Sequence, residues 1–313
     1  MPTREVYRIL GGLLVTLLLA SVTGQLLRRR HSESAAIANL NARIRAWWVL
    51  IAAAGAALIA GPIAILLLFA FVSTAGLREF LRGTLTPPST DRFAMVVCFF
   101  VALPGQYILI GLGRDDLFPL WIPVYCFLLL AIVNTVFAGT AGFLERLVIT
   151  QWGLMLCVFC LSHVPALALL RIPGFENRAP LLMAFVVLIA QVSDILQYVW
   201  GKLIGRHPVL PKLSPSKTVE GLVGGVLSVI MFGMLLTPLT PFTQWQAAGM
   251  AFMIAIAGFV GGMMMSAIKR SRGLKDWSQL IEGHGGMLDR VDSLCLSAPV
   301  FFYLTRYFFS EGP

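Results

Sequence analysis

The chain has 313 residues, of which 58% are hydrophobic and only 12% charged, and its mean hydropathy is +0.83. Charged residues make up about a quarter of an ordinary soluble domain, so this composition excludes that class and favours a membrane protein. The formal net charge is +9, but no basic cluster is interleaved with exposed aromatic residues, which argues against a nucleic-acid-binding protein.

The apolar runs predict about ten helices that cross a hydrocarbon core of about 30 Å. Gly61 and Pro62 interrupt one continuous apolar stretch, and we interpret them as a tight hairpin; a single kinked helix would reduce the count to nine. We therefore predict an all-α, polytopic integral membrane protein in which residues 1–313 form a single membrane domain. The predicted spans are 6–27, 47–60, 63–82, 93–112, 117–139, 147–170, 180–201, 219–237, 245–268 and 293–310.

Basic residues are distributed unevenly between the loops that these spans define. If the N-terminus lies outside, one face receives residues 28–46, 83–92, 140–146, 202–218 and 269–292, and with the adjoining span ends it carries 18 of the 24 Lys and Arg. The positive-inside rule places this face in the cytoplasm, and we expect the bacterial inner membrane. Every lysine falls on this face: Lys202, Lys212, Lys217, Lys269 and Lys275.

The seventh predicted helix carries one polar stripe in an otherwise apolar sequence. At 100° per residue, Gln191, Gln197, Tyr198 and Gly201 fall within about 60° of Asp194. Such a stripe turns toward a bundle interior or a wet cavity, and a carboxylate at membrane depth is functional by default. An Asp that pairs with a basic residue only to fix helix packing is the alternative.

A basic loop at 202–218 follows this helix, and its three prolines prevent it from forming one continuous helix. Its cations and hydroxyls could gather around anionic groups, and Thr218 or Ser216 could cap the next helix. A basic loop beside a membrane can equally serve topology and attraction to lipid headgroups. The groups concerned are Lys202, Arg206, Lys212, Ser214, Ser216, Lys217 and Thr218.

The polar segment 266–292 packs ten ionisable groups between two apolar helices. Cations suit phosphate oxygens, carboxylates suit a metal ion, and glycines let backbone N–H groups approach a ligand. Asp289 and Asp292 are three residues apart, so at a helix start they share one face and could hold a cation together. Three glycines surround His284. A solvated surface loop is the alternative, but it does not explain the mixture of acids and bases.

These residues resemble the phosphatidate cytidylyltransferase (CDP-diacylglycerol synthase) family over about residues 190 to 300. The family motif runs Ser, two residues, Lys-Arg, four residues, Lys-Asp, then His-Gly-Gly, two residues, Asp-Arg, one residue and Asp, and a pattern of this length is specific. The matching residues are Ser266, Lys269, Arg270, Lys275, Asp276, His284, Gly285, Gly286, Asp289, Arg290 and Asp292. Upstream, the similar residues are Asp194, Gly201, Lys202, Pro211, Lys212, Ser214, Pro215, Lys217, Thr218, Glu220 and Gly221.

The resemblance implies that phosphatidate attacks the α-phosphorus of CTP, giving CDP-diacylglycerol and pyrophosphate in phospholipid biosynthesis. A phosphate monoester with a second pKa near 6 is already largely ionised, so catalysis would rest on positioning and charge neutralisation. It implies Mg²⁺ as cofactor, with Mn²⁺ as the alternative and a second cation site left open. Its partners would be CTP, phosphatidate and membrane lipids but no nucleic acid, and a homodimer stays open.

The resemblance also implies a catalytic half at about 180–313 and three groups of site residues. The metal ligands would be Asp289 and Asp292. The catalytic residues would be Asp194, Lys269, Arg270, Lys275, Asp276, His284 and Arg290. The substrate-binding residues would be Lys202, Lys212, Ser214, Lys217, Thr218, Gly285 and Gly286.

The chain departs from the family pattern at Gly262. Four residues before Ser266 the family usually has a Gly-Asp pair whose Asp helps to bind the metal, whereas this chain has Gly261 and Gly262. The departure indicates a divergent paralogue, and it keeps other functions open. These are CTP-dependent transfer to another lipid phosphate, an impaired member that only binds lipid or nucleotide, and an ion carrier that uses the Asp194 stripe. A carrier would show two related halves, and the sequence shows no such symmetry.

Overall fold

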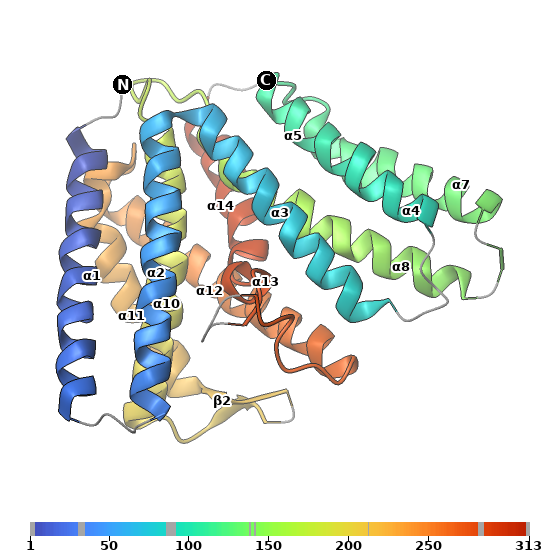
Figure 1. Ribbon diagram of the computed structural model, residues 1–313. Coiled ribbons are helices and arrows are strands. Elements are labelled where there is room, and N and C mark those ends of the chain that lie inside the picture. Colours follow the sequence, from blue (N-terminus) through green and yellow to red (C-terminus); the bar gives the residue numbers. More distant parts are fainter. Residues whose placement is uncertain are drawn as a thin grey trace.

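In a computed structural model of the chain, helices dominate (Figure 1), and eight helices within the described residues are long and apolar enough to cross a membrane. A two-stranded sheet is the only strand pairing among the residues that the structure describes. The predicted class, an all-α polytopic membrane protein, is confirmed. The described residues are 4–30, 35–85, 92–137, 139–140, 142–211, 213–280 and 285–310.

The N-terminal half contains six membrane-crossing segments, three of which include a short π-helical stretch, named η1, η2 and η3. These six segments match the predicted spans, except that α2 begins well before residue 47 because its polar start pairs with α1. The elements are α1 (Arg4–Arg30), α2 (Ala35–Ala60), α3 (Pro62–Thr84), α4 (Arg92–Val96), η1 (Val97–Ala102), α5 (Leu103–Gly111), α6 (Phe118–Leu120), η2 (Trp121–Cys126), α7 (Phe127–Phe137), α8 (Phe143–Leu154), η3 (Met155–Cys160) and α9 (Leu161–Leu167).

The C-terminal half contains two further long apolar helices, α10 and α12, and the shorter helices α11 and α14. All four lie at the predicted positions. The elements are α10 (Pro180–Ile204), β1 (Pro208–Leu210), β2 (Ser214–Thr218), α11 (Val219–Leu235), the 3₁₀ turn η4 (Thr237–Leu239), α12 (Gln244–Ser271), α13 (Leu288–Val291) and α14 (Leu294–Phe309).

The break at Gly61 and Pro62 is a hairpin, as predicted. Gly61 has a φ of 101°, a backbone region that glycine reaches at little cost. Pro62 opens α3, a position where its missing N–H leaves no hydrogen bond unmade. In Figure 1, α2 rises to this corner and α3 descends from it, so a single kinked span is excluded.

A β-hairpin interrupts the basic loop, which the sequence did not lead us to predict. β1 and β2 pair antiparallel, with Leu210 opposite Ser214. Glu220 fixes its base: Oε2 accepts hydrogen bonds from the backbone N–H groups of Arg206 (3.0 Å) and His207 (3.2 Å), and Oε1 lies 2.5 Å from Nδ1 of the His207 ring.

Thr218 ends β2 and caps α11. Its Oγ1 accepts a hydrogen bond from the backbone N–H of Gly221 at 3.1 Å, which confirms the predicted cap. The strand therefore passes directly into a membrane helix, and the residues next to the cap are held at a defined position.

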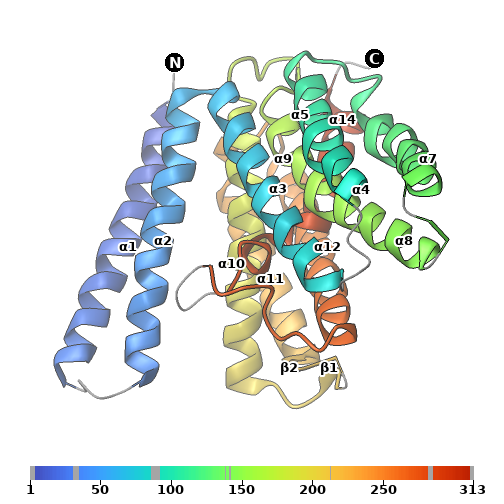
Figure 2. The same cartoon turned by 45° about the vertical axis from the view of Figure 1, so that its right-hand side comes forward.

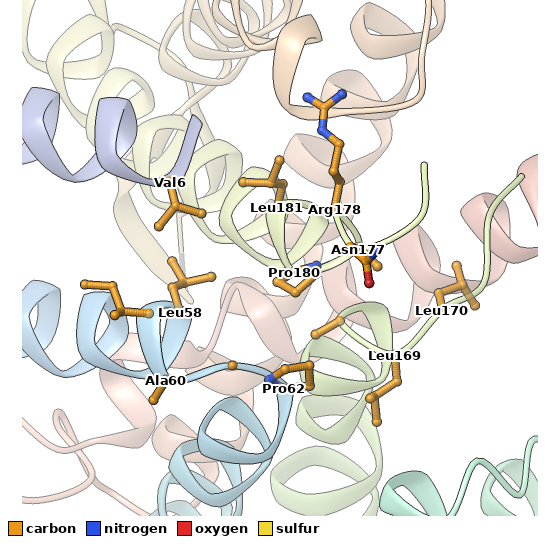
Figure 3. Close-up of a pocket in the computed structure, with 14 residues that line it drawn as sticks. Val6, Leu58, Ala60, Pro62, Leu169, Leu170, Asn177, Arg178, Pro180 and Leu181 are labelled. Carbon is orange, nitrogen blue, oxygen red and sulfur yellow. The ribbon is translucent and has the colours of Figure 1, made fainter. Parts of the chain in front are cut away.

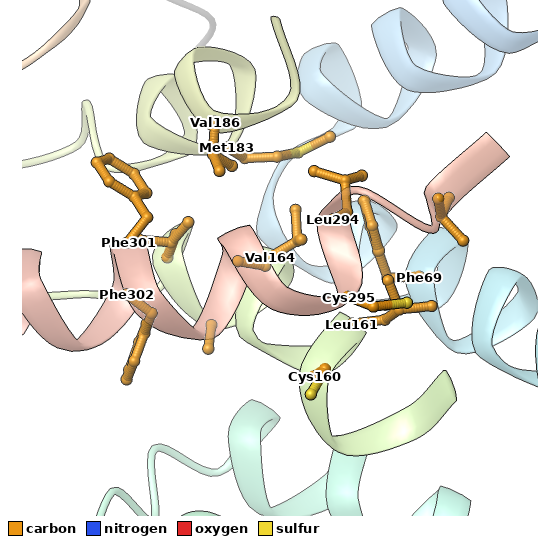
Figure 4. Close-up of a cluster of buried hydrophobic side chains, with 14 of the residues drawn as sticks. Phe69, Cys160, Leu161, Val164, Met183, Val186, Leu294, Cys295, Phe301 and Phe302 are labelled. Carbon is orange, nitrogen blue, oxygen red and sulfur yellow. The ribbon is translucent and has the colours of Figure 1, made fainter. Parts of the chain in front are cut away.

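The core lies where α9, α10 and α14 meet, with α3 beside them (Figure 4). Phe185, Phe301 and Leu161 are among the largest side chains fully removed from solvent. The cysteines at 98, 126, 157, 160 and 295 are all free and buried, and Figure 4 shows Cys160 and Cys295 within the apolar cluster. They act as small apolar side chains.

The first two helices form a hairpin at the side of the molecule (Figure 2). Asn41 Nδ2 donates to the carbonyl of Gly24 at 3.1 Å, and Trp48 Nε1 donates to Ser21 Oγ at 3.0 Å, so side-chain hydrogen bonds join α2 to the C-terminal part of α1. Only 11% of the most apolar stretch of α1 is buried within the protein, which leaves most of that helix for lipid.

The two ends of the bundle differ in the loops that they present. In Figure 1 the last turns of α1, the first turns of α2 and the β-hairpin lie at one end, and the start of α1 and the end of α14 lie at the other. Two of the basic segments that the charge pattern assigns to one face, the facing ends of α1 and α2 and the β-hairpin, therefore lie at the same end of the structure.

Candidate active site

A cavity of about 280 Å³ lies at the junction of α10, β2, α11, α12 and residues 289–292. Tyr198, Leu222 and Phe259 contribute apolar surface to it. Five charged side chains line it: Asp194, Lys217, Asp289, Arg290 and Asp292. Two loops that are far apart in sequence thus meet around one space, next to membrane helices.

The polar stripe of α10 faces this cavity, as the helical periodicity predicted. Asp194, Gln197 and Tyr198 all line the cavity, whereas the neighbouring Ser193 is buried. One turn earlier, Gln191 donates through Nε2 to the backbone carbonyl of Arg290 at 3.2 Å. The stripe therefore serves both to line the cavity and to attach the 289–292 segment to α10.

Lys217 reaches the cavity from β2. Its Nζ lies 4.9 Å above the ring centroid of Phe259, a cation–π contact. A Cβ atom added to Gly262 would lie 2.9 Å from the same Nζ. The ammonium group is thus held between an aromatic face and a helix position that has no side chain.

Asp289 is engaged on both carboxylate oxygens. Oδ1 accepts from Lys269 Nζ at 2.6 Å, and Oδ2 accepts from the backbone N–H groups of Trp277 and Gly286, each at 2.9 Å. The side chains of Lys269 and Asp289 are only 11% and 6% exposed, so this is a buried ion pair. Metal binding by Asp289 remains a prediction, and it would compete with these three donors.

Of the three carboxylates that line the cavity, Asp289 is held in an ion pair, whereas Asp194 and Asp292 form none with the described residues. Asp292 Oδ1 accepts from the backbone N–H of Ser293 at 2.8 Å, and Oδ2 would lie 3.9 Å from a Cβ at Gly262. Apart from residues 281–284 and the other stretches left undescribed, no three Asp, Glu, His or Cys residues form a ready metal site. Two carboxylates fit one hard divalent cation whose other ligands are phosphate oxygens or water.

Arg290 adds a half-buried positive charge beside these carboxylates. Burial lowers the pKa of its guanidinium, while the nearby Asp292 and Asp289 carboxylates oppose that shift, and an Arg side chain stays protonated. Its buried Nε has no hydrogen-bond partner among the described residues. An anionic ligand would supply the missing acceptor.

The other predicted site residues lie outside the cavity lining, apart from Thr218, which lines it. Arg270 is exposed and donates to the carbonyl of Leu274 at 3.2 Å, at the end of α12. Lys202 is exposed, with Nζ 5.9 Å from the ring centroid of Tyr198. Exposed Lys275 and Asp276 and half-buried Ser214 are also absent from the lining, while Lys212 and His284 lie outside the described residues.

Both glycines of the predicted substrate-binding pair pack against carboxylates. Gly285 has a φ of 81°, and a Cβ there would lie 2.8 Å from Asp289 Oδ2. A Cβ at Gly286 would lie 2.6 Å from Glu79 Oε2. In this structure they allow close packing of the loop; phosphate binding by their N–H groups stays a prediction.

Glu79, on α3, binds the loop next to this cavity, and the sequence reasoning missed it. Its carboxylate is buried and accepts hydrogen bonds from Ser278 Oγ (2.6 Å) and from the backbone N–H groups of Met287 (3.0 Å) and Leu288 (2.8 Å). One signal was available: Glu79 is an acid inside the predicted span 63–82, and intramembrane acids are rarely incidental.

A second cavity, of about 470 Å³, lies at the opposite end of the bundle (Figure 3). Its walls include Val6, Leu58 and Leu181, and among the described residues Arg178 is the only charged one that lines it. None of the described residues in its lining is acidic, so these residues offer no carboxylate to a metal ion. The smaller cavity, with five charged side chains, is the candidate active site.

Residues 41–308 match the model of the cytidylyltransferase family, a range that includes Glu79 and every residue of the cavity. The chain belongs to the cytidylyltransferase family. The resemblance seen in the sequence is confirmed, and the class of chemistry is nucleotidyl transfer by a membrane protein.

Among members of the cytidylyltransferase family, the chain is 39% identical over 300 residues to "Uncharacterized protein YnbB" of Escherichia coli K12, covering 95% of this chain and 97% of that protein. It is 30% identical over 222 residues to the phosphatidate cytidylyltransferase of Aquifex aeolicus, covering 68% of this chain and 81% of the relative. The Staphylococcus aureus phosphatidate cytidylyltransferase is 30% identical over 154 residues, 48% of this chain and 59% of the relative. This distribution fits a divergent branch of the family.

Proposed function

We propose that this cytidylyltransferase transfers the CMP group of CTP to phosphatidate. An oxygen of the lipid phosphate attacks the α-phosphorus, a new P–O–P bond forms, and the bond to the β-phosphate breaks. Pyrophosphate leaves with the bonding electrons, and the products are CDP-diacylglycerol and pyrophosphate. The single observation that supports this most is the meeting of Lys217, Arg290, Asp194 and Asp292 around one cavity beside membrane helices.

The cavity supplies the charges that this reaction needs. Lys217 and Arg290 would hold phosphate oxygens, and the unsatisfied Nε of Arg290 is a donor for one of them. Because the lipid phosphate is already ionised near neutral pH, no strong general base is required. Holding the two phosphates in line and neutralising their repulsion would account for catalysis.

We further propose Mg²⁺ as the cofactor, with Mn²⁺ as an alternative. Asp194 and Asp292 would hold it, and Asp289 would join them on releasing Lys269. When bound, the ion would neutralise charge on the triphosphate oxygens. We propose that the active site lies on the cytoplasmic face of a bacterial inner membrane, because CTP is cytoplasmic and the basic β-hairpin segment contributes Lys217 to the cavity.

The lipid acceptor would reach the cavity from the bilayer. The α10 surface next to the site carries exposed apolar side chains, including Tyr198 (62% exposed) and Leu203 (70% exposed). A water-soluble nucleotide and a substrate with two acyl chains can meet only at such a boundary. Oligomeric state is left open in this proposal, including a homodimer.

Purified protein in nanodiscs, incubated with CTP, Mg²⁺ and phosphatidate, should form CDP-diacylglycerol and pyrophosphate in equal amounts. Lysophosphatidate and a polyprenyl phosphate, tested in parallel, decide between phosphatidate and another lipid phosphate. The control variant is Arg114→Gln, which changes an exposed loop residue paired with Asp116 and distant in sequence from the cavity segments. Nucleotide binding without turnover of any acceptor would show an impaired member and contradict the proposal.

A further inference from the structure

We infer that Glu79 is a positioning residue of the active site, which makes the N-terminal half part of the catalytic machinery. This inference rests on the proposed function for its kinetic consequences, but its structural basis is independent. Glu79 lies in α3, about 200 residues before the segment that it contacts, and its exposed fraction is 8%.

The contacts join Glu79 to both described sides of the loop between α12 and α13. Ser278 donates to Oε1 from one side, and the backbone N–H groups of Met287 and Leu288 donate to Oε1 and Oε2 from the other. Residues 281–284, which include His284, lie outside the described residues. The buried carboxylate, with its three hydrogen bonds, therefore holds the two described ends of this loop in place.

The carboxylates of Glu79 and Asp289 accept hydrogen bonds from successive backbone N–H groups of the same turn. The N–H of Gly286 donates to Asp289, and those of Met287 and Leu288 donate to Glu79, so three consecutive amides are bound by two carboxylates. The N–H of Trp277, on the other side of the loop, also donates to Asp289. The backbone that carries Asp289, Arg290 and Asp292 into the cavity is thus fixed from both sides.

Gly286 lies so close to the Glu79 carboxylate that it leaves no room for a side chain. Its backbone is not in the left-handed region, so an alanine would be tolerated by the backbone itself. A Cβ there would lie 2.6 Å from Oε2 and 2.8 Å from Cδ of Glu79. The glycine is required here because Glu79 is present, which gives a test that couples the two positions.

The site therefore depends on segments that supply chemical groups and on α3, which positions one of those segments. The chemical groups come from α10, β2 and residues 289–292, while α3 sets where the last of these lie. Glu79 touches neither reacting group in this assignment, so its loss should lower kcat by displacing Asp292 and Arg290. Lys217 reaches the cavity from β2 and should still contact CTP.

The first experiment measures hydrogen–deuterium exchange of the purified full-length protein. In Glu79→Ala, peptides covering 286–291 should exchange about tenfold faster or more, because two amides lose a carboxylate acceptor. The matched control is Glu145→Gln, which removes an exposed ion pair with Arg272 at 3.1 Å and should leave that peptide unchanged. Unaltered exchange at 286–291 in Glu79→Ala would overturn the inference, whether or not the protein turns over CTP.

The second experiment is kinetic and uses Glu79→Gln, which keeps the side-chain shape. We expect kcat to fall about tenfold, with the KM for CTP within about threefold of wild type.

A third experiment couples Gly286 to Glu79. Gly286→Ala should lower kcat in the wild-type background but lower it little further in Glu79→Ala. Gly285→Ala is the comparison: because the φ of Gly285 is 81°, it should lower kcat in both backgrounds. If the losses of kcat caused by Gly286→Ala and Glu79→Ala are additive, the two positions are not coupled and the inference is contradicted. If the wild type shows no turnover, the proposed function fails and the exchange result alone decides on Glu79.

Discussion

Gly262 on α12 faces Lys217 on β2 so closely that a Cβ atom at position 262 would lie 2.9 Å from Nζ. The missing side chain therefore leaves room for the ammonium group next to Phe259 and Asp292. Where the family pattern usually has a carboxylate, this chain brings a cation to the edge of the cavity. The Lys217 ammonium therefore lies where the usual family carboxylate would bind a metal cation.

Lys217→Met should therefore impair nucleotide binding. Methionine fills a similar volume against Phe259 but removes the charge, so we expect the KM for CTP to rise about tenfold or more. The measurement is initial rate against CTP concentration at saturating lipid and metal, with Arg114→Gln as control. A KM equal to that of the wild type would show that Lys217 only shapes the loop.

The buried pair between Lys269 and Asp289 should dominate the stability of the site. Asp289→Asn leaves a buried ammonium without its partner, at a cost of about 3–5 kcal/mol. The double variant Lys269→Met/Asp289→Asn removes both charges and should melt at a higher temperature than Asp289→Asn alone. Thermal midpoints in detergent test this, and equal midpoints would argue against a shared ion pair. Both variants should lose nearly all turnover if Asp289 binds the metal.

Glu220 should matter through the β-hairpin. Glu220→Ala removes the acceptor for two backbone N–H groups and for the ring of His207, all at the base of the strands that carry Lys217. We expect the KM for CTP to rise about threefold to tenfold, with kcat changed less, because the lysine is no longer held in place. A loss confined to kcat, with KM unchanged, would indicate a different role.

The sequence predicted the helices well because their signal is local. Ten apolar runs bounded by charges and turn residues correspond to the helical segments of the structure. The orientation of Asp194 was also predictable, since a single polar stripe on an apolar helix has one low-energy orientation. Thr218 as a cap follows from the preference of its hydroxyl for an unpaired N–H.

Pairings between distant segments were beyond such reasoning. The resemblance places Lys269 among the catalytic residues and Asp289 among the metal ligands, and nothing local indicates that the two form a buried ion pair. The β-hairpin has short strands containing Pro208 and Pro215, so its strand propensity is weak, and the contacts of Glu220 with Arg206 and His207 at its base could not be foreseen from the sequence. Glu79 contacts a loop about 200 residues away, and only its position in an apolar helix marked it.

The final prediction concerns Gly262→Asp, which should lower the metal concentration needed for half-maximal rate about threefold to tenfold, because metal affinity rises with the number of charged ligands. The Lys217 ammonium is the end of a flexible side chain and can move aside, and the new Cβ would lie 3.9 Å from Asp292 Oδ2. Gly261→Asp is the matched control, because a Cβ there would lie 3.0 Å from the carbonyl of Asp292 and 3.2 Å from Leu296 Cβ, so it should destabilise the protein without improving metal binding. Titration of activity with Mg²⁺, together with direct Mn²⁺ binding followed by electron paramagnetic resonance, measures both variants. An unchanged metal midpoint in a folded, active Gly262→Asp protein would mean that the new carboxylate pairs with Lys217 and leaves the metal position unaffected.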